Sequence, residues 1–152
     1  YANGQGVAQD DKETVRWYRL AAAQGVVNAQ YNLGVMYRKG QGVAQDYKEA
    51  IRWWRLAAEQ GNADAQNNLG AMYHDGLGVS VNEVAAYALY TLSAENNPSN
   101  KKAQANRNEL AGKMNSGQIE AAQNLARRMA QGKPVQVLDA WLQTSSPKNP
   151  VH

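Results

Sequence analysis

The stretch Gly40-Gln-Gly-Val-Ala-Gln-Asp46 repeats, letter for letter, the stretch Gly4–Asp10 that lies 36 residues before it. An altered version returns at Gly76–Asn82. Residues 1–36 and 37–72 are identical at 24 positions. A tandem unit of this length cannot bury its apolar face alone, so successive units stack into a solenoid. The internal repeat therefore decides the expected fold class.

Each complete repeat is predicted to form two antiparallel helices, most clearly in the unit at 27–61. Its small and apolar residues recur at helical spacing from Ala29 to Tyr37. Gly40 and Gly42 should end this first helix, because glycine accepts the positive φ of a helix terminus. A phosphate-binding role for these glycine loops lacks support, since neither the dinucleotide fingerprint nor a Walker lysine is present.

The second helix of each repeat is predicted from its capping residues. Asp46 is followed three residues later by Glu49, which together predict a capping box. Asp10 and Glu13 predict the same box in the first copy. Asn82 can cap the third copy, but the reciprocal glutamate is missing there.

Two glycines inside the predicted first helices, Gly34 and Gly70, indicate close helix packing. Glycine in a helix interior costs about 1 kcal/mol relative to alanine, so we expect them to make room for the large side chains of Trp17 and Trp53. Arginines flank both tryptophans, as in some nucleic-acid binders. Helical neighbours point about 100° apart, so buried tryptophans beside solvated arginines are the preferred interpretation.

Composition limits the possible functions. The chain has 152 residues, of which 43% are hydrophobic, and no cysteine. The absence of cysteine excludes disulfides, thiolate metal sites and cysteine nucleophiles, and two histidines are too few for a histidine metal site. The net charge of +3 is spread along the chain, which predicts neither nucleic-acid nor membrane binding. No apolar run is long enough to span a bilayer. We expect no cofactor and no metal.

The repeat pattern resembles the Sel-1-like repeat (SLR), a relative of the tetratricopeptide repeat, over about residues 1–97. This resemblance implies an all-α fold, a right-handed α–α superhelix (solenoid) of antiparallel helix pairs. The first copy begins at Tyr1, without an opening helix, and is interpreted as a fragment of a longer chain. The third copy has Leu89 at the tryptophan position. The motif is carried by Ala29, Leu33, Gly34, Met36, Tyr37, Gly40, Gly42, Val43, Asp46, Ala50, Trp53, Ala57, Ala58 and Gly61.

The predicted organisation is a solenoid followed by a tail. The capping hairpin, which resembles the closing hairpin of bacterial family members, should contain helices near 100–114 and 118–131, the second capped by Ser116. In the tail, Trp141 and Leu142 could dock on the last helix; the alternative is a mobile tail. The solenoid, 1–131, comprises a partial repeat at 1–26, a repeat at 27–62, a divergent repeat at 63–97 and the capping hairpin at 98–131; the tail is 132–152.

Positions on the first helices that differ between copies lie on one stripe, opposite the packing face. By resemblance, they match the positions with which tetratricopeptide-type repeats hold an extended peptide or a partner helix. Their charges predict a mixed-charge or amphipathic polypeptide ligand, and ordinary variable surface is the alternative. Asn32 and Asn68 recur in both copies and could clamp a peptide backbone. The predicted groove residues are Asn28, Tyr31, Asn32, Val35, Arg38, Lys39, Asp64, Asn67, Asn68, Ala71, His74 and Asp75.

The predicted function is a non-catalytic protein–protein interaction scaffold with a protein or peptide partner. One alternative is a cell-wall or β-lactam hydrolase, because a family branch with paired cysteines is linked to β-lactams; this chain has no cysteine. His74 and Asp75 are interpreted as a solvated helix end rather than a catalytic pair. Another alternative is a spacer in a longer array. The resemblance implies a bacterial source and a periplasmic or secreted location.

Overall fold

The structure is a computed structural model that describes residues 4–145, which form eight helices and no strand. Side chains are described for residues 10–145. The helices are α1 (Gly4–Ala23), α2 (Val27–Lys39), α3 (Tyr47–Glu59), α4 (Ala63–Asp75), α5 (Glu83–Asn96), α6 (Lys102–Ala111), α7 (Ser116–Gln131) and α8 (Pro134–Ser145).

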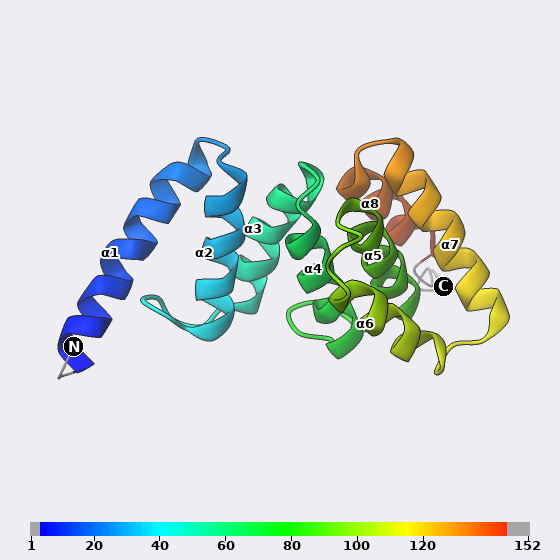
Figure 1. Cartoon of the computed structure of the whole chain (residues 1–152), viewed down its shortest axis with the longest axis horizontal. Helices are drawn as coiled ribbons and strands as arrows, with labels where there is room; N and C mark the ends of the chain where they lie inside the picture. The colour runs from blue at the N-terminus through cyan, green and yellow to red at the C-terminus, as the bar shows by residue number, and fades with distance from the viewer. Residues whose placement is uncertain (1–3, 146–152) are drawn as a thin grey trace, which may run out of the picture.

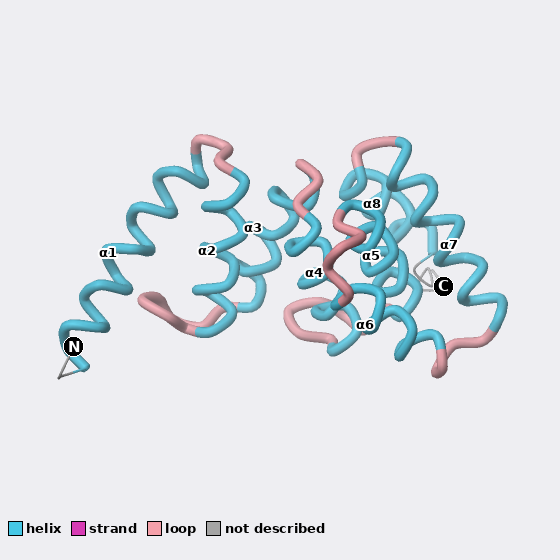
Figure 2. The backbone as a smooth tube through the Cα atoms, in the orientation of Figure 1, coloured by secondary structure: helices cyan, strands magenta, loops and turns pink. Residues whose placement is uncertain are grey.

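The helices stack in chain order along the long axis of the molecule. Figure 1 shows α1 at one end, then α2, α3 and α4, with α5 to α8 gathered at the other end. The connecting loops alternate between opposite sides of the stack (Figure 2), as expected for antiparallel hairpins. Within residues 4–145, this all-helical arrangement confirms the predicted α–α superhelical repeat.

The core is densest around α5, which packs against α4, α6 and α7. Every residue from Ala85 to Ala94 is buried. At the other end of the stack, a smaller apolar cluster joins α1, α2 and α3. Each helix pair therefore completes its interior with the next pair, as stacked repeats require.

The glycine loops end the first helices as predicted. Gly40 and Gly42 have φ of 71° and 74°, and Gly76 and Gly78 have the same values. A Cβ on Gly42 would lie 2.5 Å from the carbonyl oxygen of Asp11 on α1. The second glycine of this loop is therefore needed both for its backbone conformation and for close packing on the preceding helix.

The same sequence motif behaves differently in the first copy. Residues from Gly4 through Asp10 belong to α1, so the loop and the capping box predicted there are wrong. The loop at 40–46 ends α2 and packs on α1, whereas no described helix precedes α1 to be ended or packed upon. Without those contacts, the segment continues the helix that follows it.

The predicted caps of the second helices are partly confirmed. Asp46 accepts a hydrogen bond from the backbone N–H of Glu49 at 3.1 Å, but the Glu49 carboxylate pairs with Arg52 at 3.1 Å, so half of the expected box forms. Asn82 caps α5 through the N–H of Ala85 at 3.0 Å.

The predicted cap of α7 is wrong by one residue. Asn115, rather than Ser116, accepts the N–H of Gln118 at 2.8 Å, and the Gln118 side chain accepts the N–H of Asn115 at 3.0 Å. Asparagine followed three residues later by glutamine satisfies two helix-end donors, which explains why it starts the helix.

The tryptophan prediction is also partly wrong. Trp53 is 7% exposed in the cluster with α1 and α2, but Trp17 is 65% exposed. The residues that fill the space at Gly34 and Gly70 are instead Trp54 and Tyr90. Each lies one position after the tryptophan position of its repeat, which is Trp53 in the second copy and Leu89 in the third. Trp53 is covered by the helix pair before it, and no described pair stands before Trp17.

The last helix folds back onto the middle of the array. Arg55 on α3 and Asp139 on α8 form a two-point ion pair with N–O distances of 2.9 and 2.5 Å. The Glu59 carboxylate accepts the backbone N–H of Val135 at 2.8 Å. The side chains of Trp141 and Leu142 are partly buried and pack against the main core. Residues 146–152 of the predicted tail lie outside the described residues.

Candidate binding groove

A cavity of about 300 Å³ opens between α2 and α4 and reaches the start of α6. We call it the α2–α4 groove. Six of the twelve predicted groove residues line it. Its lining residues are Tyr31, Val35, Arg38, Lys39, Trp54, Asn68, Ala71 and Lys102.

Helical spacing brings the α2 residues to this surface. Tyr31, Val35 and Arg38 are four and three residues apart, so they lie on one face of the helix. Leu33 and Met36, on the other face, are buried in the core. These three residues of the predicted stripe, together with Lys39, therefore form one wall of the groove.

The floor of the groove is a tryptophan whose ring is held in place by a hydrogen bond. Trp54 on α3 is 1% exposed, and its Nε1 donates a hydrogen bond to the carbonyl oxygen of Tyr31 at 3.0 Å. Gly34 permits this approach, because a Cβ there would collide with the Trp54 ring. This contact holds the Trp54 ring, and with it the floor of the groove, against α2.

Three cations line the groove. Arg38 and Lys39 come from the last turn of α2, and Lys102 is the first residue of α6. The lining residues include no carboxylate. The sequence prediction missed Lys102, because it was assigned to the capping hairpin. Its position, directly after the third repeat where another first helix would start, is the signal that could have identified it.

The other half of the predicted site lies outside this cavity. The side chain of Asn106 on α6 donates to Asn67 at 3.0 Å, and Asn100 donates to Asp64 at 3.5 Å. These contacts place α6 and the loop before it against α4. Of the remaining predicted residues, Asn28 is exposed and Asn32 is half-buried.

His74 and Asp75 form the end of α4. The Nε2 atom of His74 and a carboxylate oxygen of Asp75 are 4.0 Å apart, and the Asp75 side chain is 51% exposed. Neither residue lines the α2–α4 groove. Their place next to Gly76, which ends the helix, is that of an ordinary helix end.

A second cavity, of about 290 Å³, lies between α3 and α8 and includes the Arg55–Asp139 pair. The hydrogen bond to Asp139 raises the pKa of Arg55, and burial raises the pKa of nearby Tyr73. Here the cation is already matched by an acid. In the α2–α4 groove no described residue forms an ion pair with the cations, which makes that groove the better candidate for binding.

The described residues contain few other features that could serve a function. Within residues 4–145, no group of three His, Cys, Asp or Glu side chains could hold a metal ion. No helix in that range has the length and hydrophobicity needed to cross a membrane. Burial raises the pKa of Tyr90 to about 12, and this residue packs on Gly70 in the core rather than in the groove.

Comparison with solved structures places this geometry among SLR-fold proteins. A protective antigen present in uropathogenic Escherichia coli strains, displaying an SLR fold, has a TM-score of 0.78 and 35% sequence identity over 93% of this chain. A Sel1 repeat protein from Oxalobacter formigenes has a TM-score of 0.61 and 40% identity over 68% of the chain. The chain spans only 30% and 42% of the lengths of these bacterial proteins.

The family assignment comes from the repeats themselves. No curated protein sequence matches the chain. The Sel1 repeat family model matches residues 1–26, 27–62 and 63–98, which together make up more than half of the sequence. The chain belongs to the Sel1 repeat family.

Proposed function

We propose that this chain is a non-catalytic protein–protein interaction scaffold that binds a peptide or a partner helix in the α2–α4 groove. The Sel1 repeats identify the chain as a helical repeat scaffold. The observation that carries the finer proposal is the groove, where exposed cations border apolar and aromatic side chains over a fixed tryptophan floor. Such a mixture of an apolar surface and a few polar groups is typical of binding sites.

The walls of the groove are suited to a preformed recognition surface. α2 and α4 are held by buried contacts at Gly34 and Gly70 with the helices behind them. A ligand would therefore meet side chains that are already in place, which reduces the entropy lost on binding. Stacked helical repeats present such surfaces along their array.

Site-specific photocrosslinking tests this proposal. A benzophenone amino acid at Val35 should form an adduct with a polypeptide in an extract of the source bacterium, and the same probe at exposed Ala23 on α1 should not. Ala71→Trp, which fills the groove, should abolish the Val35 adduct. Ala23→Trp is the matched control and should preserve it. No adduct at Val35, or the same adducts at both positions, would refute the role of the groove.

For location, we propose the bacterial periplasm or the cell exterior. Family resemblance alone supports this, and it is consistent with the bacterial origin of both structural neighbours. Fractionation of the source bacterium, with an antibody against this chain, should detect it in the periplasmic or culture fraction. Recovery from the cytoplasm would refute the proposal.

A further inference from the structure

We infer that the α2–α4 groove selects an acidic polypeptide segment, whose carboxylates lie between Arg38, Lys39 and Lys102. This inference rests on the proposed function and specifies the partner. It replaces the mixed-charge ligand expected from the sequence, because the acids that prompted that expectation do not line the groove.

The pairing of charges across the described residues supports an acidic ligand. Three other arginines have acidic partners on the protein: Arg16 with Glu13 at 2.9 Å, Arg52 with Glu49 at 3.1 Å, and Arg55 with Asp139. The remaining described arginines and lysines form no ion pair, and the groove differs from the rest of the surface because three of these cations meet in one cavity whose lining has no carboxylate. None of the three groove cations forms an ion pair with a described residue. The groove therefore has a positive charge that its own surroundings leave unmatched, which favours an anionic partner.

The position of Lys102 is informative because the fold does not favour a cation there. Arg38 and Lys39 lie in the last turn of α2, where the helix dipole stabilises positive charge. Lys102, by contrast, begins α6, where the dipole favours an acid. The Asn100 side chain accepts the backbone N–H of Lys102 at 3.0 Å, but no acidic residue lies in the first turn of α6. An anionic ligand would turn this unfavourable placement into a binding contact.

The rest of the lining favours a polypeptide over a nucleic acid. Val35 and Ala71 provide apolar walls, Tyr31 an aromatic surface, and Asn68 a side-chain amide. Such a site can hold an apolar side chain and a backbone amide between two acidic residues. Nucleic acids are instead bound by a continuous basic tract along the phosphates, whereas the cations here converge on one cavity.

Selection from a displayed library of random short peptides, against the whole immobilised chain, tests the inference. We expect the enriched peptides to be rich in Asp and Glu with one or more apolar residues. Fluorescein-labelled copies should bind about tenfold more weakly to Arg38→Glu and to Lys102→Glu, because each change removes one attraction and adds one repulsion. The matched controls, Arg128→Glu on α7 and exposed Lys113→Glu, should change binding by less than about twofold, because distant exposed charges are screened by salt.

Stability of the variants is separable from binding. Lys102→Glu places an acid at the start of α6, where the helix dipole favours it, so its melting temperature should not fall. A loss of binding in this variant with an unchanged melting temperature supports the inference. Binding to the groove that is unaffected by Lys102→Glu overturns it.

The outcomes distinguish this inference from the proposed function. If enriched peptides lose binding in Ala71→Trp but show no excess of acidic residues, the groove binds peptides and the acidic preference is wrong. If no peptide is enriched, or if enriched peptides bind Ala71→Trp unchanged, both proposals fail. If polyadenylate RNA displaces the acidic peptides at equal charge concentration, the site is a nucleic-acid site and the inference is overturned.

Discussion

Trp17 and Trp53 occupy the same position in two copies of one repeat, yet Trp17 is 65% exposed and Trp53 is 7% exposed. Their local sequences are nearly the same. In both helices the arginine directly before the tryptophan forms an ion pair with a glutamate three residues earlier. The difference in exposure comes from the neighbouring helices. Trp53 has α1 and α2 against it, and Trp17 has no described helix in the corresponding place.

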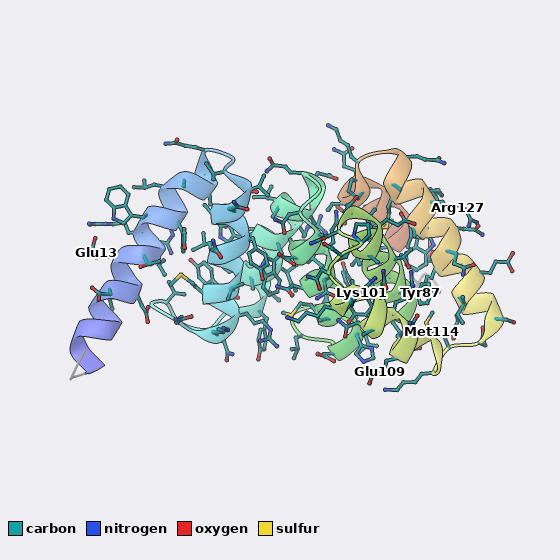
Figure 3. All side chains as sticks on the ribbon, in the orientation of Figure 1. Glu13, Tyr87, Lys101, Glu109, Met114 and Arg127 are labelled. Atoms are coloured by element: carbon teal, nitrogen blue, oxygen red, sulfur yellow. The ribbon has the colours of Figure 1, made fainter. Side chains whose placement is uncertain are left out.

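The same contrast separates the two ends of the molecule. α5 is enclosed, with every residue from Ala85 to Ala94 buried, while α1 has one long side open. Figure 3 shows Glu13 on the outer side of α1 and Arg127 at the opposite end, on α7. In a repeat protein, the stability that a residue provides depends on how many neighbours its unit has. The predictions below test this dependence.

The largest effect should come from the two tryptophans. Trp53→Ala should lower the free energy of unfolding by about 3–5 kcal/mol, because it removes a large buried side chain and leaves a cavity. Trp17→Ala should change it by less than about 0.5 kcal/mol, as an exposed substitution. Urea denaturation followed by circular dichroism measures both. Equal losses would show that Trp17 is covered in the folded protein.

The glycine motif should respond with opposite signs in the two copies. Gly42→Ala should destabilise by about 1–2 kcal/mol, because its φ is positive, and its Cβ would press on Asp11. Gly6→Ala, at the matching position, should stabilise α1 by up to about 1 kcal/mol, because that residue is helical. Thermal unfolding gives the sign of each change. A loss of stability in Gly6→Ala would contradict the helical assignment.

The ion pair between α3 and α8 should give a smaller effect. Both side chains are partly exposed, at 32% and 42%, so we expect a coupling energy of about 0.5–1 kcal/mol between Arg55 and Asp139. A double-mutant cycle with Arg55→Met and Asp139→Asn isolates this energy. The Arg52 and Glu49 pair, within one helix, is the control and should show less coupling. Zero coupling would mean that this ion pair does not help to hold α8 against α3.

The smallest effect at neutral pH should be that of Tyr90→Phe. Burial raises the pKa of Tyr90 to about 12 in the folded chain, against about 10 when unfolded. The folded state therefore retains its proton while the unfolded state loses it, so stability is full below pH 10 and falls as pH rises toward 12. Tyr90→Phe should reduce this alkaline loss in denaturation curves measured across that range. An unchanged slope would contradict the assignment.

The sequence predicted those parts of the fold that depend on local chemistry. The helix ends at Gly40 and Gly76, and the caps at Asp46 and Asn82, follow from backbone conformation and short-range hydrogen bonds. Half of the predicted groove residues line one cavity because helical spacing fixes which side chains share a face. These features need no knowledge of distant neighbours.

The features that could not be predicted depend on contacts between repeats or across the chain. Trp17 looks like Trp53 in sequence, and the two are distinguished by the helices α1 and α2 that pack on Trp53 and have no described counterpart at Trp17. The return of α8 depends on Arg55 and Asp139, which are 84 residues apart and belong to no repeating pattern. Lys102 was missed for the same reason, since a break in the period separates it from the repeats that define the groove.

The return of α8 to α3 has a consequence for how this molecule comes apart. A linear array can unzip from either end, because each unit is held only by the next one. By joining α3 to the far end, α8 turns the segment from α3 onward into a closed block that must open together, while α1 and α2 can fray alone. The α2–α4 groove lies across that border. A ligand bound in the groove would therefore hold α2 against the closed block. Amide hydrogen exchange in α2 should then be slower with the ligand bound than without it.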